Sequence, residues 1–94
     1  MIDRSIKAYK IKVVGDVQGV SYRYSAIKEA QKLELSGWVK NDLDGGVSVV
    51  IQGEAELCDK FIEWTNEGSP MAEVERVDVE KIEVDEDLKG FQVK

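Results

Sequence analysis

The stretch from Gly15 to Arg23, GDVQGVSYR, combines two glycines with an arginine that arrives where a helix should begin. Glycine-rich turns between a strand and a helix let successive backbone N–H groups point at one spot, and such turns bind phosphate-like anions. A cation is unfavourable at a helix N-terminus, which already carries partial positive charge. A bound anion would remove that conflict, because the planar guanidinium of Arg23 could bind two of its oxygens. The alternative is a plain turn followed by a surface arginine.

A second candidate is Asn41, which closes the short segment GWVKN just before a tight turn. An amide there both donates and accepts hydrogen bonds, so it could orient a water molecule or bind a substrate. The alternative is that Asn41 caps the turn through its own backbone, as asparagine usually does. Asp42 and Asp44 stand in a run too short for a calcium loop, and Cys58 is expected to be a core residue on the inner face of a helix.

The composition limits the chemistry that is open to these residues. The chain has 94 residues, no histidine and one cysteine, so it has no histidine base, nucleophile or metal ligand. A zinc site is disfavoured as well, and we expect no metal and no cofactor. The lone cysteine fits the reducing cytoplasm, and the apolar runs are too short to span a membrane.

The net charge of −6 is unevenly distributed. Residues 1–40 hold eight Lys/Arg and four Asp/Glu, a net charge of +4, whereas residues 41–94 hold five and fifteen, a net charge of −10. An acidic surface argues against nucleic acid as a partner, because phosphate contacts need a basic face. It leaves room for a small anion in the positive half, where Arg23 lies.

The hydrophobic pattern predicts alternating strands and helices. Strands are expected at 7–14, 37–41, 47–52, 74–84 and 91–93, and helices at 22–33 and from Gly53 to Gly68. Ser21 could cap the first helix, residues 42–46 (DLDGG) predict a hairpin turn, and a change of apolar phase near Glu80 predicts a bulge or bend. The order β-α-β-β-α-β indicates a ferredoxin-like α/β sandwich of the α+β class, with an antiparallel sheet and both helices on one face. We expect a single domain over residues 1–94.

Taken together, these motifs resemble the acylphosphatase family over nearly the whole chain. The resemblance rests on the following segments: GDVQGVSYR (15–23), GWVKN (37–41), DGGV (44–47), Gly53, GSP (68–70) and the closing Gly90-Phe91. It implies an enzyme that hydrolyses acyl phosphates to a carboxylate and inorganic phosphate without a metal. It also implies that inorganic phosphate or sulfate competes with the substrate.

The resemblance assigns roles residue by residue. Arg23 matches the phosphate-binding arginine of the family and Asn41 the asparagine that places the attacking water. The phosphate cradle is the backbone of the loop Gly15, Asp16, Val17, Gln18, Gly19 and Val20.

Two residues depart from the family pattern. Asp16 stands where a basic residue is usual, and we expect its carboxylate to repel the bound phosphate slightly. Glu34 stands where a glycine often ends the first helix, and a non-glycine residue in the left-handed region costs about 1–2 kcal/mol.

Two other functions remain open at this point. One is a non-catalytic module that binds phosphate or another anion in the same fold. The other, an RNA-binding sheet of similar topology, is disfavoured by the net charge of −6 and by the missing aromatic ribonucleoprotein motif. The enzyme is expected to act as a monomer.

Overall fold

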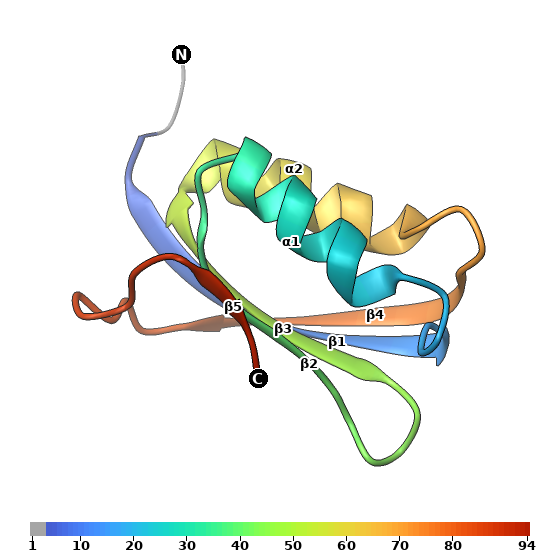
Figure 1. Ribbon diagram of the computed structural model, residues 1–94. Coiled ribbons are helices and arrows are strands. Elements are labelled where there is room, and N and C mark those ends of the chain that lie inside the picture. The colour runs from blue at the N-terminus through green and yellow to red at the C-terminus, as the bar shows by residue number, and fades with distance from the viewer. Residues whose placement is uncertain (1–3) are drawn as a thin grey trace.

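The computed structural model describes residues 4–94 and places two helices on one face of a five-stranded sheet (Figure 1). The strands are β1 (Ile6–Asp16), β2 (Ser36–Asn41), β3 (Val47–Glu54), β4 (Glu73–Ile82) and β5 (Phe91–Val93), and the helices are α1 (Tyr22–Lys32) and α2 (Ala55–Glu67). This arrangement confirms the expected ferredoxin-like sandwich. Within residues 4–94, no helix is long and apolar enough to cross a membrane.

The sheet is mixed rather than wholly antiparallel, which corrects the sequence expectation. Its strand order is β4-β1-β3-β2-β5, and all neighbours are antiparallel except β2 and β5, which pair in parallel. The antiparallel pairings make β4 end where β2 begins. The segment after β4 therefore crosses at that end of the sheet and enters β5 in the direction of β2.

A bulge lies at the start of β4, so the expectation of an irregularity near Glu80 was wrong. The register with β1 is regular from Ile82 to Arg76 and then shifts, so that Gly15 faces Val74 and Glu75 is left over. Gly15 has a φ of 144°, and a Cβ there would collide with the backbone of β4. Glycine is thus required where β4 comes closest to β1.

Helix α1 begins at Tyr22 as expected, but its expected cap and the start of α2 differ from the expectation. Gly53 lies within β3, paired with Lys7, and α2 begins two residues later at Ala55. Ser21 precedes α1, but its φ of 64° puts it in the left-handed region and its side chain makes no capping hydrogen bond. The strand pairing with β1 extends β3 through Gly53, and the left-handed backbone at Ser21 departs from the extended conformation that a capping residue typically has.

The core lies between the helices and the inner face of the sheet. Ile11 and Val13 of β1 pack there against Cys58 and Phe61 of α2, and all four are fully buried. Burial raises the pKa of the Cys58 thiol to about 11, so the group stays protonated and unreactive at neutral pH. The alternation of β1 and the core role of Cys58 are confirmed.

Tyr22, the first residue of α1, ties that helix to the end of α2. Its side chain is 1% exposed, its hydroxyl donates to the backbone carbonyl of Thr65 at 2.8 Å, and its ring lies 5.2 Å from that of Trp64. A Cβ on Gly68 would lie 2.5 Å from the Tyr22 ring, so the α2 terminus needs a glycine to accept it. Desolvation raises the pKa of the Tyr22 hydroxyl, which therefore remains a donor.

A charged network holds the turn between β2 and β3. The Lys12 ammonium contacts the Asp42 carboxylate at 2.5 Å and the Asp44 carboxylate at 2.9 Å, and Ser48 donates to Asp42 at 2.6 Å. Partial burial opposes ionisation of Asp42, but the hydrogen bonds from Lys12 and Ser48 hold its pKa below the usual value. The Gly46 N–H and then Lys12 lower the pKa of Asp44 in the same direction.

Helix α1 ends in a Schellman motif with a glutamate in the left-handed position. Glu34 has a φ of 56°, its N–H donates to the Gln31 carbonyl, and the Leu35 N–H donates to the Ala30 carbonyl at 2.9 Å. Glu34 therefore takes the left-handed conformation that was expected for the residue standing where the family often has a glycine.

Replacing Glu34 with glycine should stabilise the protein. Glycine removes the left-handed strain of about 1–2 kcal/mol but loses about 0.5–1 kcal/mol more chain entropy on folding, which leaves a gain of up to about 1.5 kcal/mol. Urea unfolding measures it as a higher midpoint at unchanged slope. The matched control is Gln31→Gly inside the helix, which should destabilise by about 1 kcal/mol. A loss of stability in Glu34→Gly would contradict the strain.

Replacing Lys12 with methionine should lower the urea midpoint of unfolding at pH 7, because two carboxylates lose their charged donor. The folded-state pKa values of Asp42 and Asp44 are depressed, so the stabilisation is complete above the ordinary carboxylate pKa and disappears as the pH falls through the lower folded value. Urea unfolding of wild type and variant should therefore converge below about pH 4. The control is Lys10→Met, since Lys10 has no ion pair within residues 4–94. An equal difference at pH 7 and pH 3 would rule the network out.

Candidate active site

The sheet topology brings three separate segments to one end of the molecule (Figure 1). The loop after β1, the first turn of α1 and the end of β2 meet around a cavity of about 150 Å³. The lining residues are Val17, Gly19, Ser21, Tyr22, Arg23, Tyr24 and Asn41. Arg23 and Asn41 are eighteen residues apart in the chain, yet they line the same cavity.

The two polar side chains of interest are exposed and without protein partners. Within residues 4–94, the Arg23 guanidinium makes no ion pair or hydrogen bond, and the first turn of α1 contains no acidic residue. The Asn41 amide also makes no hydrogen bond in this part of the chain, because the turn after it is closed by Asp44, whose carboxylate accepts from the Gly46 N–H. The turn-capping alternative for Asn41 is therefore not seen.

Backbone donors gather at the same place. Across the described chain, the N–H groups from Val17 to Tyr24 have no protein acceptor, and the first main-chain bond of the helix is from Ser25 to the Ser21 carbonyl. Gly19 has a φ of 74° and open space where a Cβ would stand, so no side chain covers this part of the loop. Unpaired N–H groups at a helix N-terminus, next to a free guanidinium, favour an anion.

The remaining loop residues lie outside the cavity lining. Gly15 and Asp16 belong to the end of β1, and Asp16 is exposed opposite Glu73. Gln18 donates from Nε2 to the carbonyls of Asp42 and Gly46, both at 2.8 Å, which links the loop to the turn after Asn41. The repulsion expected from Asp16 stays a prediction, and Asp16 is not among the residues that line the cavity.

Some contributors to this site were not singled out in the sequence. Tyr22 and Tyr24 flank Arg23 and line the cavity, and their neighbourhood to Arg23 was the only signal. Ser69 is 3% exposed and donates from Oγ to the carbonyl of Val20 at 2.6 Å, which fixes the end of the loop. Forty-nine residues separate Ser69 from Val20, so no local pattern announces this contact.

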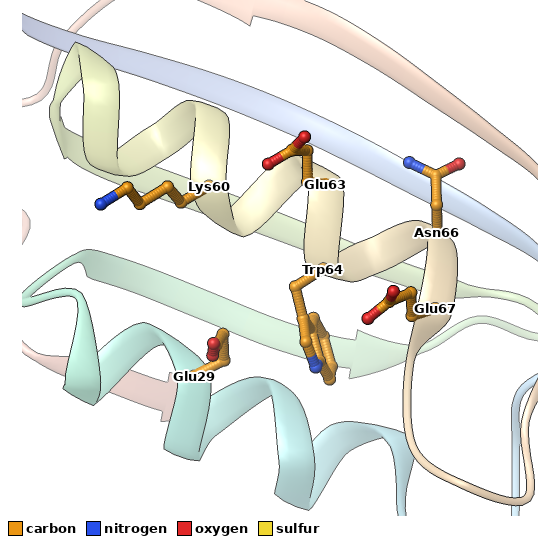
Figure 2. A pocket seen from close by; sticks show the side chains of 6 residues that line it. All are labelled: Glu29, Lys60, Glu63, Trp64, Asn66 and Glu67. Carbon is orange, nitrogen blue, oxygen red and sulfur yellow. The ribbon is translucent and has the colours of Figure 1, made fainter.

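A larger hollow of about 520 Å³ lies elsewhere, between the two helices (Figure 2). It is lined by Glu29, Lys60, Glu63, Trp64, Asn66 and Glu67. Three carboxylates against one ammonium repel phosphate, so size alone does not make this groove the site for an anion.

The described residues also hold no group of three or more His, Cys, Asp or Glu side chains arranged to bind a metal ion.

Comparison with known proteins agrees with this geometry. The acylphosphatase family model matches residues 9–93. An acylphosphatase of Thermococcus kodakarensis is 46% identical over 83 residues, covering 88% of this chain and 90% of that protein. The structure of an acylphosphatase from Coxiella burnetii superimposes with a TM-score of 0.90 at 40% identity over the whole of both chains. The acylphosphatase of Bacillus subtilis also gives 0.90, at 36% identity over 96% of this chain and 99% of that one.

The match therefore extends from β1 through β5 and includes each segment that forms the cavity. With a family model spanning most of the chain and relatives well above 30% identity over nearly their full length, the chain belongs to the acylphosphatase family.

Proposed function

We propose that this chain hydrolyses acyl phosphates in the cavity between the β1–α1 loop, the first turn of α1 and the end of β2. In this proposal Arg23 and the unpaired loop N–H groups bind the phosphoryl group, and Asn41 positions the attacking water. The observation that carries it is that one cavity collects a free guanidinium, a free amide and a run of unpaired N–H groups.

In this proposal the main role of the cavity is to position the phosphoryl group and to stabilise its charge. Phosphoryl transfer passes through a loose transition state in which charge is spread over the equatorial oxygens, so catalysis is largely positioning and electrostatic stabilisation. The guanidinium fork of Arg23 suits two of these oxygens, and the loop N–H groups suit the others. An anion would also offset the unfavourable placement of Arg23 at a helix N-terminus.

The chemical step needs few side chains. The oxygen of the water held by Asn41 attacks phosphorus, and the bond from phosphorus to the bridging oxygen breaks. The leaving carboxylate keeps the electron pair of that bond, and one proton of the water passes to an oxygen of the phosphoryl group. The products are a carboxylate and dihydrogen phosphate, so atoms and charge balance. A carboxylate is a weak base, so the reaction needs no general acid.

The proposal extends to the surroundings of the reaction. Inorganic phosphate or sulfate competes with the substrate, because either anion suits the same donors. The chain acts without a metal or cofactor, as a single domain and a monomer in the cytoplasm. The second candidate, an anion-binding module without turnover, has the same donors, and a hydrolysis assay separates the two.

Replacing Arg23 with alanine should lower kcat/KM for acetyl phosphate by at least about 10²–10³, the cost of losing one transition-state donor. Arg23→Lys should also fail, since an ammonium cannot form two parallel hydrogen bonds. The exposed side chain has no partner to lose, so circular dichroism should show an unchanged fold. Arg76→Ala is the matched control, an arginine on β4 that pairs with Asp78 away from the cavity. Wild-type turnover in either Arg23 variant would refute the assignment.

Replacing Asn41 with alanine should lower kcat by about 10²-fold while KM changes little, because a displaced water affects the transition state more than substrate binding. Steady-state kinetics with acetyl phosphate separate the two constants. Asn66→Ala on α2 serves as the control. An effect on KM alone would mean that Asn41 binds the substrate and not the water.

A further inference from the structure

Tyr24 presents an aromatic ring at the edge of the cavity. Its exposed fraction is 63%, whereas Val17 and Tyr22, the other large apolar lining residues, are each 1% exposed. Exposed apolar side chains are common on protein surfaces and mean little by themselves. The exposed Tyr24 ring, however, borders the same cavity as Arg23 and Asn41, so a substrate bound in that cavity can contact it.

The donors of the cavity decide where each part of the substrate can bind. Arg23 and the unpaired loop N–H groups bind the phosphoryl group, so the acyl substituent contacts the rest of the lining of this cavity of about 150 Å³. Apart from Tyr24, the exposed part of the lining is formed by Gly19, Ser21, Arg23 and Asn41, which offer little apolar surface.

The direction of the reaction points to the same residue. In phosphoryl transfer the attacking and leaving oxygens lie roughly in line through phosphorus. A water held by Asn41 on β2 therefore sends the carboxylate away from β2, and Tyr24 belongs to α1. The Lys28 ammonium lies 5.3 Å from the centroid of the Tyr24 ring and covers part of it from one turn further along the helix, which limits how the ring can turn.

We propose that Tyr24 is a specificity-determining residue whose ring contacts the acyl substituent, so that the enzyme favours acyl phosphates with an aromatic or large apolar acyl group. This inference rests on the proposed function of the cavity. A flat ring stacks on another aromatic group over a large area, whereas an acetyl methyl covers little of it.

The test compares benzoyl phosphate with acetyl phosphate in wild type, Tyr24→Ala and Tyr24→Phe. The ratio of their kcat/KM values is measured for each protein and divided by the wild-type ratio, which cancels the intrinsic reactivity of the two anhydrides. Tyr24→Ala should lower the benzoyl-to-acetyl ratio about three- to tenfold, as expected for the loss of one aromatic pair. Tyr24→Phe keeps the ring and should stay within about twofold of wild type.

The matched control is Val84→Ala. Val84 is 43% exposed and follows β4, at the end of the sheet opposite the cavity, and its removal should leave the ratio unchanged. An unchanged ratio in Tyr24→Ala, or an equal fall in Val84→Ala, would overturn the inference. Inhibition by inorganic phosphate gives a second readout, because a tenfold weaker inhibition of Tyr24→Ala would place the ring at the phosphoryl group instead.

Arg23→Ala measured beside these variants separates the two proposals. Wild-type turnover in Arg23→Ala would contradict the phosphate site itself. An inactive Arg23→Ala combined with an unchanged ratio in Tyr24→Ala would contradict the role of Tyr24 alone.

Discussion

Tyr22 places its hydroxyl against the carbonyl of Thr65 at 2.8 Å and its ring against Trp64, and so holds the first residue of α1 to the last turns of α2. A buried side chain at one helix position fixes the directions of its neighbours, since successive residues are rotated by a fixed angle around the axis. With Tyr22 turned into the core, Arg23 and Tyr24 are turned outward. The geometry of the cavity therefore depends on the contact that Tyr22 makes with the end of α2.

Around this contact the protein leaves polar groups unpaired where most folds would satisfy them. Ser21 occupies the capping position in a left-handed conformation and caps nothing, and the N–H groups beside it have no acceptor in the described chain. A side-chain cap is worth about 1 kcal/mol to a helix, so its omission is a small cost in stability. An anion in the cavity would recover that stabilisation, and ligand binding and folding are thus linked through the same donors.

Much of this arrangement could be predicted from the sequence, because the relevant signals are local. The glycines in residues 15–19 with the arginine after them form one local pattern, and the asparagine before a hairpin turn forms another. The parallel pairing of β5, the bulge at Glu75 and the bond from Ser69 to Val20 could not, since each joins segments far apart in the chain. The exposure of Tyr24 could not be predicted either, because tyrosine occurs both in cores and on surfaces and its residue type does not tell the two apart.

The strand order also determines when the cavity can exist during synthesis. β3 lies between β1 and β2 in the sheet, although it follows both in the chain. The loop after β1 and the end of β2 are therefore held beside each other only once residues 47–54 have inserted between them, and β1 gains its other neighbour only with residues 73–82. Pairings of such long sequence separation make folding slow relative to helical proteins of this size. On the ribosome, Arg23 and Asn41 are therefore both made before the strand that holds their segments beside each other.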